Sequence, residues 1–192
     1  WSVVTNNGEY SLSMSTGFSS IALCDGDNSV VSTTGGRSSA INTGQYSVSA
    51  ATGYNSKSEN IGHHSVSVVT SCESNVNAKG FYSIATSTGS ASTATTKGIF
   101  SSAINTGSFS NSITDGKSSI SANTGKLSVA KSVGKRSVAV NTGDESVSAV
   151  EGSDSIAVVT GRYGKAAGAL GCWLVLSEIG NNDEILDVQT VK

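Results

Sequence analysis

Short stretches of alternating residue character recur along the whole chain. After each of a series of evenly spaced glycines, seven residues alternate in character, as in "GQYSVSAATG" at 44–53. A period of two is that of a β-strand, and no stretch shows the period of an amphipathic helix. The pattern therefore predicts an all-β chain that forms a short strand and then a turn every nine residues.

The glycines set the length of the repeat. Steps of nine residues from Gly8 to Gly161 meet glycine at seventeen of eighteen stops, with Ser71 as the exception. We number the residues after each stop as positions 1 to 8; position 3 is serine in every repeat except the last, which has Gly164. A disordered Ser/Gly linker has no reason to keep such a phase, so the spacing indicates a folded repeat. Glycine is expected to supply the positive φ angle of the corner.

The residue before the glycine shows that the structural unit is eighteen residues long. In alternate repeats this residue is always threonine: Thr16, Thr34, Thr52, Thr70, Thr88, Thr106, Thr124, Thr142 and Thr160. We therefore predict a parallel β-solenoid (β-roll) of about nine coils over residues 8–169. Each coil has two strands and two corners, and the threonine hydroxyls of one corner can bond to the turn backbone. At about 4.8 Å per coil the rod is roughly 43 Å long.

Side-chain direction follows from the cost of burying charge. Positions 4 and 6 include Lys57, Glu59, Asn75 and Lys131, and each would cost several kcal/mol if buried without a partner in a thin roll. Positions 3 and 5 are therefore expected to point inward, where serine and alanine form a narrow column with serines bonded along it.

The outward positions differ between the two strands of a coil. On the strands that end in threonine, fifteen of eighteen are apolar and none is charged, whereas the opposite strands have eight apolar and four charged residues. The apolar stripe is on the order of 1,000 Å², more than a soluble monomer usually exposes. We expect it to be buried in a parallel two-fold or three-fold bundle of identical chains, with a trimer favoured over a dimer. The expected interface residues are Leu12, Met14, Val30, Val48, Val66, Val68, Ile84, Ile104, Ile120, Val138, Val140, Ile156 and Val158.

The repeat stops near residue 169, which divides the chain into a repeat domain (1–169) and a capping segment (170–192). The capping segment is expected to form a hairpin with strands at 172–177 and 185–191. Trp173, Leu174 and Leu176 are available to cover the open end of the last coil, which would otherwise present bare ladder edges.

Two stretches carry a resemblance to a known family. "GKRSVAVNTGDES" (134–146) and "GSDSIAVVTG" (152–161) resemble the head repeats of trimeric autotransporter adhesins, in which a Ser-Val-Ala-Ile-Gly motif builds a parallel β-roll and three rolls associate side by side. This chain differs in placing two more residues before the glycine. The repeats followed by "GALGCWLVLSE" (168–178) are also similar to uncharacterised repeat proteins of bacteria and their prophages, which implies a virion fibre or a surface fibre.

Composition and candidate chemistry narrow the functional classes. A net charge of −2 with 14% charged residues gives no argument for binding nucleic acid, and no apolar run is long enough to span a membrane. Cys24, Cys72 and Cys172 lie at different phases of the repeat, so we expect no disulfide. Aspartates do not recur regularly, so a calcium roll is not expected. No other metal site and no cofactor are expected either. The pair His63–His64 is interpreted as surface residues of a corner without a chemical role. No serine has a histidine and a carboxylate in phase with it, so the chain is expected not to be an enzyme.

One corner carries an aromatic file of Tyr46, His64, Tyr82 and Phe100 at position 2 of four successive coils. Stacked rings stabilise the edge of a solenoid, and exposed rings can also bind the faces of sugars, so this file is a candidate ligand edge. The structural interpretation is favoured.

Together these features indicate a rigid, structural or adhesive module of a bacterial surface adhesin or a phage tail fibre. We expect it to be extracellular, on a cell surface or a virion, and to bind copies of itself and a receptor or glycan. The alternative is an ice-binding β-solenoid that works as a monomer. A third class is a repeat domain of a larger toxin or enzyme, because Trp1 falls within a repeat and indicates that the protein continues upstream.

Overall fold

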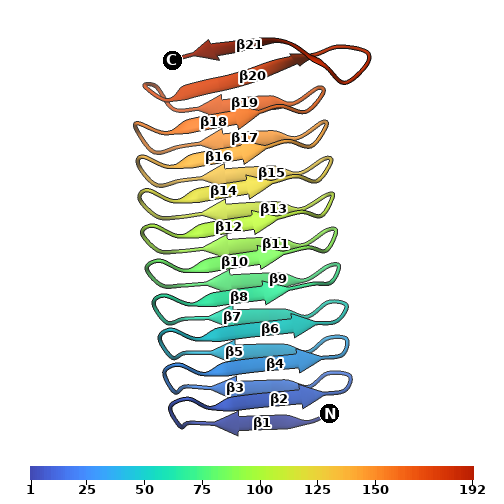
Figure 1. The fold of residues 1–192 in the computed structure, drawn as a ribbon, viewed down its shortest axis with the longest axis vertical. Coiled ribbons are helices and arrows are strands. Elements are labelled where there is room, and N and C mark those ends of the chain that lie inside the picture. Colours follow the sequence, from blue (N-terminus) through green and yellow to red (C-terminus); the bar gives the residue numbers. More distant parts are fainter.

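The chain is a stack of short strands wound into one rod. The computed structural model describes all residues 1–192 and contains strands and turns but no helix (Figure 1). The rod is a parallel β-solenoid of about 10 turns with about 18 residues per turn, so the predicted fold class and coil length are confirmed.

Two sheets run along the rod, joined by a corner on each side (Figure 1). The 10-stranded sheet contains β1 (Val3–Asn6), β3 (Ile21–Cys24), β5 (Ser39–Asn42), β7 (Lys57–Asn60), β9 (Asn75–Ala78), β11 (Thr93–Thr96), β13 (Asn111–Thr114), β15 (Val129–Ser132), β17 (Val147–Val150) and β19 (Lys165–Gly168). The 11-stranded sheet contains β2 (Leu12–Thr16), β4 (Val30–Thr34), β6 (Val48–Thr52), β8 (Val66–Val69), β10 (Ile84–Ser87), β12 (Ser102–Asn105), β14 (Ile120–Asn123), β16 (Val138–Asn141), β18 (Ile156–Val159), β20 (Trp173–Ile179) and β21 (Ile185–Val191). We call the latter the threonine sheet, because its repeat strands are followed by the threonine corner.

Every strand of the solenoid pairs in parallel with the strands 18 residues before and after it. In the threonine sheet, for example, Ala85 pairs with Ser67 on one side and with Ala103 on the other. The register does not change from coil to coil, so residues at the same repeat position stack directly above one another. Side chains of the same repeat position therefore form a continuous line along the rod.

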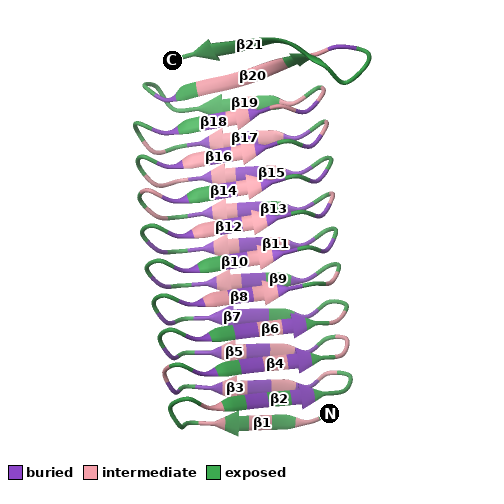
Figure 2. Cartoon of the chain, viewed as in Figure 1, coloured by how far each residue is buried: buried purple, intermediate pink, exposed green.

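The interior is narrow and is lined by small side chains. Positions 3 and 5 are buried throughout the middle coils, which confirms the predicted inward direction, and Figure 2 shows this alternation along the strands. Position 7 also points inward, and it carries the larger buried side chains Val69, Val150 and Val159. Inward serines bond across the roll: when Ser58 Oγ donates to Ser49 O, it accepts from Ser67 Oγ, and both distances are 2.8 Å.

Asparagines at position 7 fasten one sheet to the other. In Asn105, Nδ2 donates to Ser92 O at 2.9 Å and Oδ1 accepts from Gly107 N at 3.0 Å. The same pair of bonds recurs at Asn42, Asn60, Asn123 and Asn141. Each of these side chains is buried with its polar atoms bonded, so it stabilises the coil where an unpaired amide would destabilise it.

The glycines are required for space and not, as predicted, for a positive φ. In the repeat corners only Gly17 and Gly35 have φ angles in the left-handed region. A Cβ placed on Gly44 would instead overlap the carbonyl oxygen of Gly26 in the coil before it, and it would lie 2.9 Å from Asp27 N. The same overlap recurs at most other corners, because the backbones of adjacent coils approach too closely there for any side chain.

The left-handed conformation falls on position 2 of each corner. All eighteen residues there are other than glycine and have φ between 52° and 59°, among them Tyr46, Ala91 and Phe100. Each costs about 1 kcal/mol or more. The bond that compensates runs between coils, because the position 2 N–H donates to the position 1 carbonyl of the next coil, as in Tyr46 N to His63 O at 2.9 Å.

Serine at position 3 bonds each corner to the preceding coil. Ser101 Oγ accepts from Ser83 N at 3.2 Å and donates to Gly80 O at 3.0 Å. One hydroxyl thus satisfies a donor and an acceptor of the coil before it. This double role accounts for the near-invariance of serine at this position along the chain.

The C-terminal segment forms the predicted hairpin, and the hairpin extends the threonine sheet. β20 pairs in parallel with β18, and β21 pairs antiparallel with β20. Leu174 follows the inward register of Ala157 and packs against the last core cluster. Trp173 follows the outward register of Ile156 and is 43% exposed, so the expectation that it covers the open end is wrong.

Replacement of the inward Ala139 with leucine should destabilise the solenoid. Ala139 is fully buried between two sheets that leave no room for three more carbons. Overpacking is expected to cost about 1 to 3 kcal/mol or more, measured as a lower midpoint of chemical denaturation. An unchanged midpoint would contradict the inward direction of position 5.

Two substitutions in one corner separate the spatial from the conformational role of glycine. Gly89→Ala should destabilise strongly, because its Cβ would overlap the backbone of Ser71 and Cys72. Ala91→Gly removes a left-handed residue with φ of 54° and adds freedom to the unfolded chain, so it should change stability by less than about 1 kcal/mol. Equal losses in thermal denaturation would show that φ, and not space, selects glycine.

Candidate functional site

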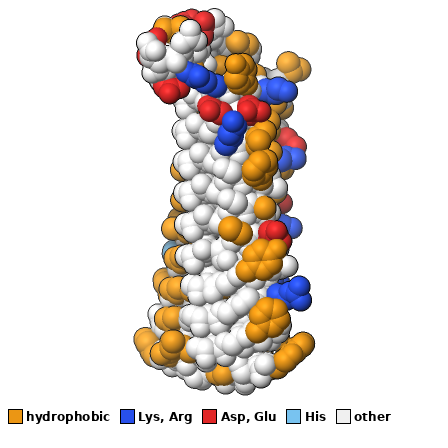
Figure 3. All heavy atoms as spheres, turned by 90° about the vertical axis from the view of Figure 1, so that its right-hand side faces the viewer, with side chains coloured by type: hydrophobic (Ala, Val, Ile, Leu, Met, Phe, Trp, Pro, Cys, Tyr) orange, Lys and Arg blue, Asp and Glu red, His pale blue; other side chains and the backbone are white.

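The expected interface residues all lie on the outer face of the threonine sheet, at positions 4 and 6 of strands β2 to β18. None of the thirteen is buried, and Leu12, Met14 and Ile120 are 59%, 55% and 48% exposed. We call this surface the apolar face. In Figure 3 it forms the left flank of the rod, where hydrophobic side chains and no charged ones are seen below the hairpin.

The apolar face is longer than predicted. Trp173 and Val175 continue it onto β20, because they pair with Ile156 and Val158 in the same outward register. The alternation within "CWLVLS" could have revealed this, had the register of the repeat been carried past residue 169.

The outer face of the 10-stranded sheet carries charge. Lys131 pairs with Glu151 at 2.6 Å, and Glu59 pairs with both Lys57 and Lys79. Lysines and carboxylates on this side keep it hydrated, so the two broad faces of the rod differ in chemistry along its length.

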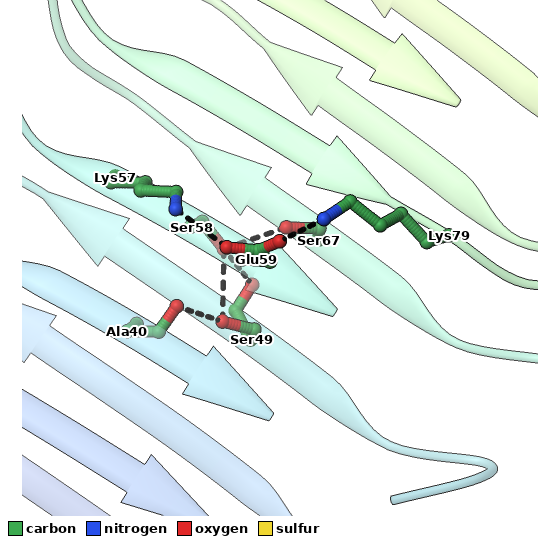
Figure 4. Close-up of polar contacts among 7 residues, drawn as sticks. All are labelled: Ala40, Ser49, Lys57, Ser58, Glu59, Ser67 and Lys79. Carbon is green, nitrogen blue, oxygen red and sulfur yellow. Dashed lines mark hydrogen bonds and ion pairs between the residues drawn. The ribbon is translucent and has the colours of Figure 1, made fainter. Parts of the chain in front are cut away.

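Glu59 is the most buried carboxylate and lies between two lysines (Figure 4). Its carboxylate oxygens are 2.5 Å from Lys57 Nζ and 2.6 Å from Lys79 Nζ, and the residue is only 8% exposed although it lies on an outer face. Burial alone would raise the pKa of Glu59, but the hydrogen bonds and charges of Lys57 and Lys79 outweigh it and lower the pKa below the ordinary value of 4.5. The cluster ties β7 to the corner that follows β9.

The aromatic file stacks as predicted along the corner that precedes the strands of the threonine sheet. Ring centroids are 4.9 Å apart for Tyr46–His64 and His64–Tyr82 and 5.2 Å apart for Tyr82–Phe100, with interplanar angles of 8° to 12°. A second stack beside it joins His63 and Phe81 at 4.8 Å. We call the four-membered stack the ring file.

Stacking leaves the ring file with exposed edges and covered faces. Tyr46, Tyr82 and Phe100 are 59%, 53% and 54% exposed, yet the faces of the inner rings lie against their neighbours. A sugar stacks on the face of a ring, and only the outer faces of the two end rings are open to it. Ring edges and neighbouring apolar atoms instead suit contact with another protein surface.

Histidine has a structural use at this corner. Nδ1 of His63 accepts from Phe81 N at 2.9 Å, as Asp27 Oδ1 accepts from Gln45 N at 2.7 Å. Both bonds satisfy an N–H of the next coil. No group of three or more His, Cys, Asp or Glu side chains is placed to hold a metal ion, and the three cysteines are unpaired.

The threonine file lies on the opposite corner and is exposed. Figure 3 looks onto this corner, where a strip of uncharged polar and backbone atoms runs beside hydrophobic side chains and most of the charged side chains lie toward the C-terminal end. Among the threonines that end the strands, only Thr52 forms a backbone bond, to Thr33 O at 3.4 Å, so most of these hydroxyls face solvent and do not bond the turn as predicted. The file is one residue wide.

A cleft of about 290 Å³ lies between the last corner and the hairpin. Its main side chain, Arg162, pairs with Asp183 at 2.8 Å and donates to the carbonyls of Gly180 and Asn181 at 2.7 and 3.0 Å. The guanidinium therefore holds the hairpin turn against the last coil.

The comparisons with known proteins add no relative. The chain matches no protein-family model, no curated protein and no solved structure. No helix is present that could cross a membrane. The fold itself defines the class: the chain is a parallel β-solenoid repeat protein with a fibre-like shape.

Glu59→Gln should destabilise the protein at neutral pH and have little effect in acid. A carboxylate whose pKa is lower in the folded chain stabilises it above the unfolded pKa, and this contribution is lost as the pH falls through the folded pKa. Denaturation midpoints of the two proteins should therefore converge in acid, once the pH falls below the lowered pKa of Glu59. Glu151→Gln is the control, because its pair with Lys131 is exposed and contributes little. A difference that persists unchanged in acid would contradict this account.

Proposed function

We propose that this chain is a non-enzymatic, rigid module of an extracellular fibre, a bacterial surface adhesin or a phage tail fibre, whose copies associate side by side through the apolar face. The observation that carries the proposal is the absence of charge from one face along the full rod. An exposed apolar surface on the order of 1,000 Å² is unusual on a monomer and is large enough for one side of a stable interface.

The composition of the interior supports this proposal. The core clusters consist mainly of alanine with a few valines, so burial within one chain removes little apolar surface from water. The larger aliphatic side chains Leu12, Ile84 and Ile120 lie outside, on the apolar face. Association would bury the apolar surface that the thin roll cannot accommodate.

The serine hydroxyls at position 3 are engaged in structure, which supports a non-enzymatic role. Position 3 serines are buried and bonded to the neighbouring coil, and His63 bonds a corner N–H. A nucleophile needs a free hydroxyl beside a base, and these groups are held elsewhere.

Replacement of Val66 and Val140 with lysine should dissociate the assembly. Each lysine would have to be buried without a partner, at a cost of several kcal/mol, which is about a hundredfold or more in the association constant. The measurement is molar mass by light scattering at micromolar concentration. Lysines at Asn75 and Asn111, on the 10-stranded sheet, are the control and should leave the mass unchanged. Equal effects of the two double variants would contradict the assignment of the faces.

The alternative function is ice binding by a monomer, and the exposed threonine file favours it. Ice-binding solenoids use flat arrays of threonine, whereas this file is a single line, and Thr93 and Thr95 on β11 lie between asparagines of β9 and isoleucine and asparagine of β13. A monomeric wild-type protein that shows thermal hysteresis would replace the fibre proposal with this one.

A further inference from the structure

The corner that holds the ring file does not repeat its chemistry along the rod. Positions 1 and 2 of this corner form nine rungs, from Glu9–Tyr10 at rung 1 to Ser153–Asp154 at rung 9. The ring file occupies rungs 3 to 6, and Phe81 and Ile99 at position 1 widen its centre. This corner borders the apolar face, because position 4 of the same repeats begins each strand of the threonine sheet.

Charges of opposite sign flank the ring file. Glu9 and Asp27 lie on rungs 1 and 2, and Lys117, Lys135 and Arg136 lie on rungs 7 and 8. None of these five side chains forms an ion pair within the chain, although Asp27 Oδ1 accepts from Gln45 N. The acidic and basic rungs are placed symmetrically about the point between rungs 4 and 5, which is also the centre of the ring file.

Such a pattern is self-complementary under one operation. A two-fold axis across the rod, between rungs 4 and 5, turns the second copy upside down and brings the same corner of both copies together. Rung 1 then meets rung 8 and rung 2 meets rung 7, so acidic residues face basic ones at both ends. Rungs 3 to 6 meet one another, so ring edges pack against ring edges.

We propose that the partner of this surface is a second copy of the chain in antiparallel orientation, with apolar face on apolar face and ring file on ring file. This inference rests on the proposed self-association and names its direction. The apolar face is uncharged and fits both directions, so the parallel bundle expected from the stripe alone has no support from charge on that face.

A parallel pair would match these residues less well. A two-fold axis along the rod brings the ring-file corner against the partner's threonine corner. There Glu145 already pairs with Lys126 at 3.1 Å, Asp144 Oδ1 accepts from Arg162 N at 2.8 Å, and Arg37 lies 5.7 Å from the centre of the Phe18 ring. Most charges on that corner are engaged within the chain, and the ring file would face a broken row in which Glu73 and Ser90 separate the rings of Tyr54 and Phe109.

An antiparallel pair also has a functional consequence. Two rods paired by this two-fold axis point in opposite directions, so they can join two fibres or two opposing surfaces. The adhesive contact would then be made by the protein to itself.

Charge reversal at either end tests the pairing. Lys117→Glu with Lys135→Glu makes both ends acidic, and Glu9→Lys with Asp27→Lys makes both ends basic. Each double variant alone should associate about tenfold or more weakly than wild type, because every substitution counts twice across a two-fold axis. An equimolar mixture of the two should regain wild-type association, measured by sedimentation equilibrium, because each acidic end then meets a basic end.

The control for the mixture carries the same charge elsewhere. Lys131→Glu with Lys165→Glu lowers the net charge by the same amount on the outer face of the 10-stranded sheet. It should associate like wild type, and mixing it with the basic variant should not restore that variant to wild-type association, because one end of the mixed pair still brings basic residues together. Recovery in both mixtures, or in neither, would overturn the antiparallel pairing.

A distance measurement reads the direction without charge changes on the matched rungs. A spin label on Asp154→Cys, in a Cys72→Ser background, lies on rung 9, and its copy across the axis is nine rungs away, about 43 Å along the rod. A parallel assembly would place the two labels at the same height and much closer together. A short distance in a protein that still associates through Val66 and Val140 would overturn the antiparallel inference and leave the proposed function standing. A monomeric wild-type protein would remove both.

Discussion

The close approach of adjacent coils at the corners is the constraint on which the rest of the structure depends. Parallel strands fix the rise at about 4.8 Å per coil, and the corners must stack at that same rise although their residues belong to neither β-sheet. The carbonyl oxygen of one corner glycine consequently occupies the space of a Cβ on the next. The serine hydroxyl at position 3 and the N–H of the left-handed residue at position 2 both bond one corner to its neighbour across this short gap.

This constraint also explains the unusual distribution of apolar residues. Two sheets joined by tight corners lie close together, and the space between them accepts alanine, serine and a few valines. Stability within the chain must therefore come largely from hydrogen bonds, of which 118 join backbone groups. Branched aliphatic side chains do not fit inside, so their enrichment on one outer face is a separate property of the sequence. It is this separation that makes the face a candidate for contact with another molecule.

The period of the sequence was sufficient to predict the fold, the coil length and the inward direction of positions 3 and 5. The predicted reason for the glycines was wrong. Crowding between residues 18 apart cannot be seen along the chain, and the general preference of glycine for positive φ suggested a different reason. The recurrence of Asn-Thr-Gly, as at 105–107 and 123–125, was a readable signal for the buried asparagines, since asparagine bonds the backbone two residues on. The burial of Glu59 under two lysines depended on neighbours from another coil, which periodicity does not specify. Whether the apolar face and the ring file bind anything stays a prediction.

A rod built by translation cannot specify its own assembly with the residues that repeat. If two uniform stripes slide past one another by one coil, they lose only the last pair of contacts, and inversion of one rod changes little more. Register and direction must come from residues that break the translation. On this chain these residues are concentrated at the corners, where the side chains at positions 1 and 2 are free to vary because they point away from both sheets. The ring file and its charged flanks form the longest non-repeating feature beside the apolar face. The repeat thus supplies area for contact, and the departures from the repeat supply its specificity.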